Sequence, residues 1–421
     1  MMTDFKKKDI LSLIKDSFFY GLSKLIPGLF GLISVIFFFR WVGAEEYGQY
    51  SIIFSFTNLI AAFSFGWLNQ SILRYGSSFS SENKIVYPLI IGSVYGVSFI
   101  ISILAIGSYF YFPTKFPLTK TILLAGSIAV FNQIKTRFQS NESPKNVVLI
   151  TSLQSFLMFA FAFFTTRWIG ANAVSLLLGL ACGYLIPSIF CIKRIHLGQI
   201  WTDKNKLMVK KFFNYGAPLS LWFGIQLSLN FSDRFFIEQF YGPHLMGSFA
   251  GFSEFIIRVF SIIIFPVTLA IHPKVMNQWN RNQNTRETFR HILNGGLLQI
   301  VIFLGVLVLA FVFKHHIFNA ILSLVPGIDM EMERLLIPLL IGGFLWQFGL
   351  IVHKPLEVAE KTKKMVLCIL GALAINIIGN YFFLPKYGLI VTAYTMIASG
   401  TFYILSTVMF STPLRRRVHS E

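Results

Sequence analysis

Runs of about 20 apolar residues recur along the whole sequence, and this recurrence constrains the fold more than any other feature. A helix of about 20 residues spans the hydrocarbon core of a bilayer. Inside that core only helices and closed barrels satisfy the polar backbone groups. The runs cover twelve stretches: 17–39, 49–72, 85–110, 120–138, 147–166, 173–192, 212–237, 246–271, 292–313, 335–352, 365–384 and 389–410. The sequence therefore predicts an all-α polytopic membrane protein with about twelve transmembrane helices.

The composition excludes several other classes of protein. Charged residues make up 13% of the 421 residues and hydrophobic residues 55%, whereas soluble globular chains carry roughly 25% charged residues. The three cysteines lie in apolar runs without a CxxC pair, and no histidines have metal-ligand spacing on a span. The chain also lacks a Walker A sequence. We therefore expect no metal site, no cofactor, no catalytic residue and no enzyme activity.

Lysines and arginines gather in the loops on one side of the predicted membrane. With the N-terminus inside, the cytoplasmic segments hold about 26 of them and the opposite loops about 7. Cytoplasmic loops of membrane proteins carry such an excess. We expect both termini in the cytoplasm. The net charge of +18 is then explained by these loops and requires no nucleic-acid partner.

The longest predicted loop divides the chain into two halves of six spans. Both halves contain the pattern G-x-x-x-x-G-x-aromatic between their first and second spans, at residues 43–50 and 242–249. Parallel repeats of six spans occur in secondary transporters. We predict two six-helix lobes joined by a cytoplasmic linker, with the N-terminal lobe at 1–195, the linker at 196–211 and the C-terminal lobe at 212–421.

Six short motifs follow one another over nearly the whole chain. They are Gly43-Ala-Glu-Glu-Tyr-Gly-Gln-Tyr50, Gly66-Trp-Leu-Asn-Gln-Ser-Ile-Leu-Arg-Tyr75, Ser232-Asp-Arg-Phe-Phe-Ile237, His272-Pro273-Lys274, Asn376-Ile-Ile-Gly-Asn380 and Leu384-Pro-Lys-Tyr-Gly-Leu389. In this order the chain resembles bacterial polysaccharide and O-antigen flippases of the multidrug/oligosaccharidyl-lipid/polysaccharide exporter superfamily. It departs from that family after Gly388, where Leu389 and Ile390 replace small residues.

The resemblance implies a two-lobed helical bundle that acts by alternating access. Its substrate would be an undecaprenyl-diphosphate-linked oligosaccharide, the repeat unit of an O-antigen, a capsule or an exopolysaccharide. The protein would move this lipid from the inner to the outer leaflet of the bacterial cytoplasmic membrane. A glycan polymerase and glycosyltransferases are further candidate partners.

Charged side chains within the spans are the candidate binding residues. A charge at mid-bilayer costs roughly 2.5–3.5 kcal/mol on insertion scales and usually faces the bundle interior. An anionic diphosphate requires cations there, and the candidates are Lys24, Arg40, Arg74, Arg234 and Arg258. Arg258 lies halfway along its span. Because Glu254 is four residues earlier, both ligand contact and a structural ion pair remain open for Arg258.

The acids Asp233 and Glu254 are candidates for binding a coupling ion or for pairing with the cations. Arg234 lies near the outer end of its span, where contact with lipid headgroups is an alternative to contact with substrate. Lys24 precedes Pro27, Gly28 and Gly31. These residues predict either a kink that opens the helix, or close-packing positions at the two glycines.

An ion-coupled multidrug exporter of the same superfamily is the alternative function. An exporter of cationic drugs needs surplus negative charge, with an acid on the first span. The first span here carries Lys24 and no acid. We therefore expect the flippase.

Overall fold

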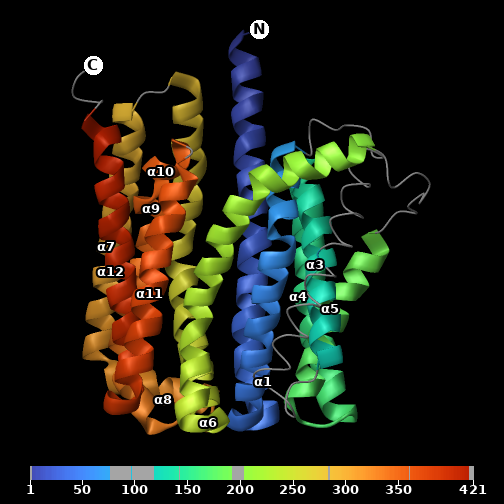
Figure 1. Ribbon diagram of the computed structural model, residues 1–421, viewed down its shortest axis with the longest axis vertical. Helices are drawn as coiled ribbons and strands as arrows, with labels where there is room; N and C mark the ends of the chain where they lie inside the picture. Colours follow the sequence, from blue (N-terminus) through green and yellow to red (C-terminus); the bar gives the residue numbers. More distant parts are fainter. Residues whose placement is uncertain are drawn as a thin grey trace. The chain divides into compact units, whose positions relative to one another are not determined.

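The computed structural model describes residues 2–75, 96, 118–141, 143–191, 203–282, 285–359 and 361–416. Every regular element in these ranges is a helix (Figure 1). Within them, eight stretches are long and apolar enough to cross a membrane. The expected span at 85–110 lies outside the described residues, apart from Gly96.

Two of the eight stretches are pairs of helices joined at a single glycine. In α1 (Met2–Tyr75) the glycine is Gly43, with φ 77° and ψ 175°. In α6 (Asp203–Asn282) it is Gly242, with φ 83° and ψ 174°. Glycine adopts such positive φ values without the clash that a Cβ causes. Figure 1 shows the chain reversing in α1, so that its two legs lie side by side. Each pair supplies two of the expected spans.

The other described helices are single segments. They are α3 (Leu118–Ser140), α4 (Pro144–Trp168), α5 (Ala173–Cys191), α7 (Thr285–Val312), α8 (Lys314–Leu324), the 3-10 helix η2 (Met330–Leu335), α9 (Leu336–Val352), α10 (Lys354–Val358), α11 (Thr362–Tyr387) and α12 (Ile390–Arg416). Together with the legs of α1 and α6 they confirm an all-α multi-pass membrane protein. Because α6 begins at Asp203, residues 203–211 of the expected linker are helical.

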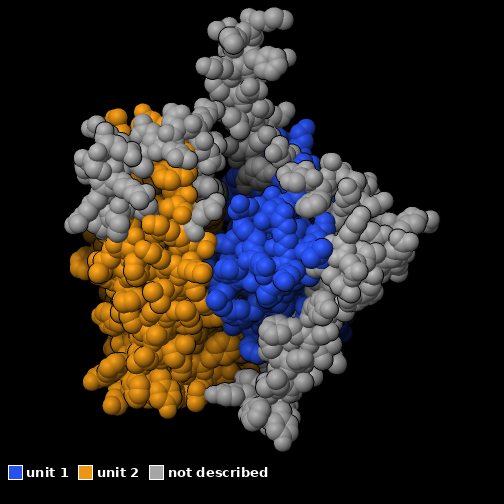
Figure 2. Space-filling model, turned by 45° about the horizontal axis from the view of Figure 1, so that its top comes forward, with its two compact units in different colours: residues 1–34, 53–224 blue, residues 35–52, 225–421 orange. Residues whose placement is uncertain are grey.

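The chain forms two compact units, which Figure 2 colours separately. Unit 1 consists of Met1–Ser34 and Ile53–Gly224, and unit 2 consists of Val35–Ile52 and Ile225–Glu421. The turn of α1 at Gly43 thus belongs to unit 2, and the start of α6 belongs to unit 1. The two lobes and the linker inferred from the sequence stay a prediction.

Close helix packing holds unit 1 together. Helix α5 packs against α4 and α3. Gly179 and Gly183 of α5 face the backbone of α4, where an added Cβ would overlap Ala162 or Met158. Small residues four apart allow this close approach of membrane helices. The second leg of α1 packs on the start of α6 through a buried cluster of Trp67, Leu68, Ile72 and Phe212.

Unit 2 buries an aromatic core and exposes an apolar stripe. Helix α9 packs against α7 and α12, and α11 packs against α12. Phe303 of α7 stacks on Phe344 of α9, with ring centroids 4.0 Å apart. On its other side α7 exposes large apolar side chains three or four residues apart, namely Leu297, Val301, Leu304, Val308 and Phe311. Such a stripe is suited to face the lipid of the bilayer.

The two glycine motifs meet within unit 2. A Cβ at Gly48 would overlap the carbonyl oxygen of Pro243, and a Cβ at Gly247 would overlap the carbonyl oxygen of Ala44. Ala44 and Pro243 each follow the first glycine of their motif, so the contact is reciprocal. The first glycine of each motif makes the turn, and the second allows the two turns to pack backbone to backbone.

Candidate functional site

Three charged side chains from the two legs of α6 form a cluster in unit 2. Nη2 of Arg234 lies 2.8 Å from Oε1 of Glu254. Nη2 of Arg258 lies 3.1 Å from Oε2 of the same carboxylate. One carboxylate is therefore shared by two guanidinium groups. This cluster, here called the charge triad, carries one positive charge in excess.

The turn at Gly242 creates the triad, because it returns the chain so that Arg234 on the first leg meets Glu254 on the second. Arg258 follows Glu254 by four residues and lies on the same helix face. The exposed fraction of the side chain is 7% for Arg234, 15% for Glu254 and 36% for Arg258. Arg258 is therefore the member of the triad whose charge is presented to its surroundings.

Residues near the turn of α1 complete the surroundings of the triad. Arg234 donates a hydrogen bond to the hydroxyl of Ser51. Tyr47 and Tyr50 of α1 lie near Arg258, with their ring centroids 5.5 Å apart. Arg234 is thus buried among protein groups, and the interpretation that it reaches lipid headgroups is wrong. The sequence interpretation did not include these three α1 residues as site residues, although the motif at residues 43–50 contains both tyrosines.

Asp233 contacts a different set of residues from the triad. Nδ2 of Asn380 donates to Oδ1 of Asp233 at 2.6 Å and to Oδ1 of Asn376 at 3.1 Å. The Ser232 hydroxyl donates to Oδ1 of Asn376 at 2.7 Å, and the Thr395 hydroxyl lies 3.3 Å from Oδ1 of Asn380. Asp233 is 8% exposed, and no salt bridge joins it to another described residue. The buried carboxylate thus accepts a hydrogen bond from a neutral amide, and the hydroxyls of Ser232 and Thr395 bond the amides of this cluster.

The other arginine candidates make separate contacts. Arg40 donates from Nε to the Leu324 carbonyl at 2.7 Å and from Nη2 to the Ser323 carbonyl at 2.6 Å. It thus binds carbonyl groups at the C-terminal end of α8, which a helix leaves without intrahelical partners. The guanidinium of Arg74, in unit 1, lies 4.5 Å from the ring centroid of Tyr215. Neither arginine belongs to the triad.

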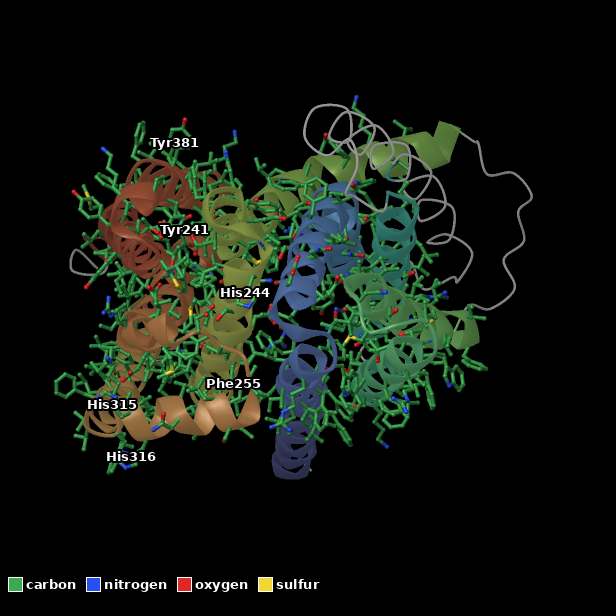
Figure 3. The ribbon with its side chains drawn as sticks, turned by 90° about the horizontal axis from the view of Figure 1, so that it is seen from below. Tyr241, His244, Phe255, His315, His316 and Tyr381 are labelled. Atoms are coloured by element: carbon green, nitrogen blue, oxygen red, sulfur yellow. The ribbon has the colours of Figure 1, made fainter. Side chains whose placement is uncertain are left out.

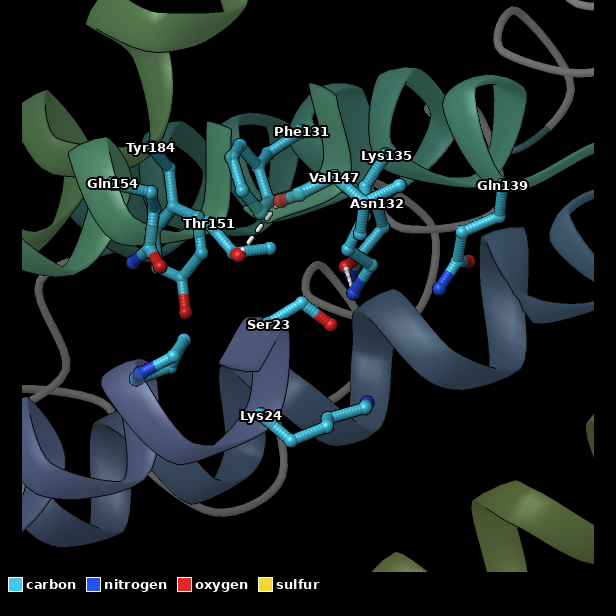
Figure 4. A pocket seen from close by; sticks show the side chains of 11 residues that line it. Ser23, Lys24, Phe131, Asn132, Lys135, Gln139, Val147, Thr151, Gln154 and Tyr184 are labelled. Carbon is cyan, nitrogen blue, oxygen red and sulfur yellow. Dashed lines mark hydrogen bonds between the residues drawn. The ribbon is translucent and has the colours of Figure 1, made fainter. Parts of the chain in front are cut away.

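Lys24 lines a cavity of about 160 Å³ in unit 1 (Figure 4). Lys135 of α3 lines the same cavity. The backbone of α1 stays helical past Pro27, because Gly43 is the residue at which its angles depart from the helix. A Cβ at Gly28 would meet nothing within 4 Å. The structure therefore shows no opened helix at Pro27 and no close packing at Gly28, whereas Gly31 is buried.

The histidines and acids of the described residues do not form a metal-binding cluster. No group of three or more His, Cys, Asp or Glu side chains is placed to hold a metal ion in the described part of the chain. His315 and His316 are neighbours on α8 (Figure 3). Nδ1 of His315 lies 2.6 Å from Oε1 of Glu333, and the His315 side chain is exposed.

Comparison with known proteins relates this chain to polysaccharide biosynthesis proteins. The family model for polysaccharide biosynthesis proteins matches residues 13–279. The chain belongs to this family. A protein of Shigella flexneri named "Putative O-antigen transporter" is 21% identical over 402 residues, which cover 90% of this chain and 93% of that protein.

Two solved transporter structures share the fold. The lipid II flippase MurJ, in an inward closed conformation, matches with a TM-score of 0.73 and 16% identity over 93% of this chain and 87% of MurJ. An outward-facing MATE family multidrug resistance transporter of the MOP superfamily matches with a TM-score of 0.67 and 16% identity over 96% of both chains. At these identities the similarity establishes a MOP-type transporter fold.

Proposed function

We propose that this protein flips an undecaprenyl-diphosphate-linked oligosaccharide from the inner to the outer leaflet of the bacterial cytoplasmic membrane by alternating access. The observation that carries the proposal is the excess positive charge of the triad within the membrane-spanning helices of unit 2. An anionic diphosphate needs compensating charge to cross about 30 Å of hydrocarbon. Guanidinium groups supply that charge together with paired hydrogen bonds to phosphate.

Arg258 is the proposed phosphate ligand of the triad. Its side chain is 36% exposed and uses Nη2 for Glu254, which leaves other guanidinium donors for a ligand. Arg234 has a positioning role, because it neutralises the second oxygen of Glu254 and anchors the triad to Ser51. Arg40 and Arg74 have structural roles in this proposal.

Ion coupling is assigned to Asp233 and not to Glu254. Both oxygens of Glu254 are bound by arginines, whereas the Asp233 hydrogen bonds come from neutral groups. A proton or a small cation would compensate the buried Asp233 charge. Asp233→Asn, which has nearly the same shape, should remove the dependence of transport on the coupling ion. Unchanged ion dependence in this variant would contradict the assignment.

The similarity to a multidrug transporter favours ion-coupled drug export as the second candidate function. A cationic drug would be repelled by two arginines that share one carboxylate. On this ground the flippase is the better-supported function. Deletion of the gene should leave drug sensitivity unchanged and remove surface glycan; the opposite pattern would favour the exporter.

As a flippase the protein is a transporter without enzymatic chemistry. It lies in the inner membrane with both termini in the cytoplasm. Glycosyltransferases supply its substrate on the inner face, and a glycan polymerase uses the product on the outer face. The expected partners are therefore the lipid-linked oligosaccharide, the bilayer and these enzymes.

Leaflet-resolved labelling in a depletion strain tests the proposal. Loss of the protein should leave synthesis of the lipid-linked oligosaccharide intact, and the lipid should accumulate in the inner leaflet. Expression of the wild-type chain should restore labelling at the outer face. If synthesis itself stops, or if outer-leaflet labelling continues without the protein, the proposed function is wrong.

A further inference from the structure

We infer that three neutral amide side chains beside Arg258 form a subsite for the first sugar of the lipid-linked substrate. They are Gln226 and Asn230 on the first leg of α6 and Gln347 on α9, all within unit 2. Their amides would hydrogen-bond the hydroxyl groups of the sugar that is joined to the diphosphate. The inference rests on the proposed function, because it names the part of the substrate that lies next to the proposed phosphate ligand.

The hairpin of α6 places Asn230 at the level of Arg258. Arg234 on the first leg meets Glu254 on the second at 2.8 Å. Asn230 precedes Arg234 by four residues, and Arg258 follows Glu254 by four residues. Residues four apart share a helix face, and the two legs run in opposite directions from the turn at Gly242. Asn230 and Arg258 therefore both lie one helical turn beyond that contact, on the side away from the turn.

The next turn of the hairpin is polar as well. Gln226 precedes Asn230 by four residues, and Ser261 follows Arg258 by three. Nε2 of Gln347 donates to Oγ of Ser261 at 3.4 Å, so α9 adds its amide at this level. Polar groups thus continue beyond Arg258 for about one helical pitch of 5.4 Å.

The amides retain hydrogen-bonding capacity for a ligand. Asn230 is exposed and Gln226 is half-buried, and neither forms a hydrogen bond with another described residue. Oε1 of Gln347 is buried, and no described residue donates to it. Hydrogen bonds between helices explain many polar residues in spans, but Asn230 and Gln226 make none with the described helices. Because polar groups in spans usually face the bundle interior or a water-filled cavity, these amides are placed to meet a polar ligand.

A sugar matches the chemistry of these groups. A carboxamide offers both donors and an acceptor, and each sugar hydroxyl likewise donates and accepts. The three amides add no charge, whereas a further anionic group would need a cation to compensate it. Because the first sugar is bonded directly to the diphosphate, it has to lie close to the phosphate ligand. The amides within one helical turn of Arg258 meet that requirement.

The position of the subsite along the hairpin suits substrate loading. In the predicted topology the turn at Gly242 faces outward. Gln226 and Gln347 therefore lie on the cytoplasmic side of Arg258. The oligosaccharide is made on that side of the membrane under the proposed function, so its first sugar would reach the amides as the diphosphate reaches Arg258.

Binding to the purified full-length chain in nanodiscs tests the inference. The probes are undecaprenyl diphosphate and the lipid-linked oligosaccharide extracted from cells depleted of this protein, and native mass spectrometry reports occupancy. Asn230→Leu, Gln226→Met and Gln347→Met remove an amide with little change in shape. Each should weaken binding of the sugar-bearing lipid by about 2- to 10-fold, the range for losing one neutral hydrogen bond. Binding of undecaprenyl diphosphate should not change.

Two further variants serve as controls. Asn230→Gln keeps an amide at the position and should retain part of the affinity for the sugar-bearing lipid. Asn319→Leu removes an exposed asparagine of α8, outside the hairpin, and should bind both probes as the wild type does.

The two probes separate contact with the sugar from contact with the phosphates. Loss confined to the sugar-bearing lipid supports the subsite. Equal loss for undecaprenyl diphosphate would assign the amides to the phosphates and overturn the inference. Wild-type affinity for the sugar-bearing lipid in all three amide-free variants, with melting temperatures that show folded protein, would also overturn it.

Failure of this inference is separable from failure of the proposed function. If the wild-type chain flips substrate but the amide-free variants bind it normally, only the sugar subsite is wrong. If the wild-type chain does not flip substrate, the proposed function is wrong whatever these variants bind.

Discussion

Replacement of Arg258 by alanine separates ligand binding from structural pairing. If Arg258 served only to neutralise Glu254, the alanine variant would fail because the buried Glu254 had lost its partner. Arg234 prevents this, because its Nη2 remains 2.8 Å from Oε1 of Glu254. Arg258→Ala should therefore leave a folded protein that has lost the exposed charge of the triad.

The exposures of the side chains set the expected magnitudes. Arg258 is 36% exposed and Glu254 keeps its second guanidinium partner, so loss of this ion pair should lower the free energy of unfolding by only about 1 kcal/mol. Loss of its contact with a phosphate should cost about 1.5–3 kcal/mol of binding free energy, which is roughly 10- to 150-fold in affinity. Glu254→Ala should destabilise the protein by about 3–5 kcal/mol, because it leaves the buried Arg234 without a carboxylate.

The assay compares surface glycan and melting temperature at matched protein levels. Arg258→Ala should reduce glycan export strongly with little change in melting temperature, and Arg258→Lys should retain part of the export because a point charge still attracts phosphate. Arg290→Ala, at an exposed arginine of α7, is the matched control and should behave as wild type. Normal export by Arg258→Ala would refute the ligand role. Adding Glu254→Ala to it should not restore export, because Arg234 then becomes the unpaired charge.

Three further predictions concern the packing and the topology. Gly247→Val should destabilise the protein by about 1–3 kcal/mol, because the group next to Gly247 is a backbone carbonyl. Gly28→Ala is the control and should be neutral or stabilising by up to about 1 kcal/mol. Equal melting temperatures of these two variants would contradict the packing of the two turns. Arg40→Ala should cost about 1 kcal/mol through loss of the α8 contacts and leave export intact, and lost export at full stability would assign it a substrate role. Reporter fusions should place residues 193–211 in the cytoplasm and residues 315–331 outside, and the reverse pattern would contradict the orientation.

The transmembrane helices could be predicted from the sequence because the bilayer sets their length. Apolar runs of about 20 residues marked all the described spans. The Glu254–Arg258 pair could be predicted as well, because residues four apart share a helix face. The contact of Glu254 with Arg234 could not, because it depends on the angle at which the two legs of α6 meet at Gly242. No periodicity in the sequence records that angle.

The role of Lys135 in unit 1 could not be predicted from the sequence either. Lys135 lies within the predicted span at 120–138, yet it is not among the charged candidates that the sequence predicts. In the structure it lines the cavity with Lys24. Its position inside a span was the available signal, but recognising the cavity required the packing of four helices. The hydroxyl of Ser51 was missed for a similar reason, because its partner Arg234 is 183 residues away in the chain.

Reconstitution of the purified chain tests the flippase function most directly. Proteoliposomes are prepared with a fluorescent lipid-linked oligosaccharide in both leaflets, and a membrane-impermeant glycosidase is added outside. In protein-free vesicles the inner-leaflet pool stays protected. With the wild-type chain the account predicts that this pool becomes accessible, and that Arg258→Ala slows its exposure. An inner-leaflet pool that stays protected in vesicles containing folded wild-type protein and its coupling gradient would contradict the account.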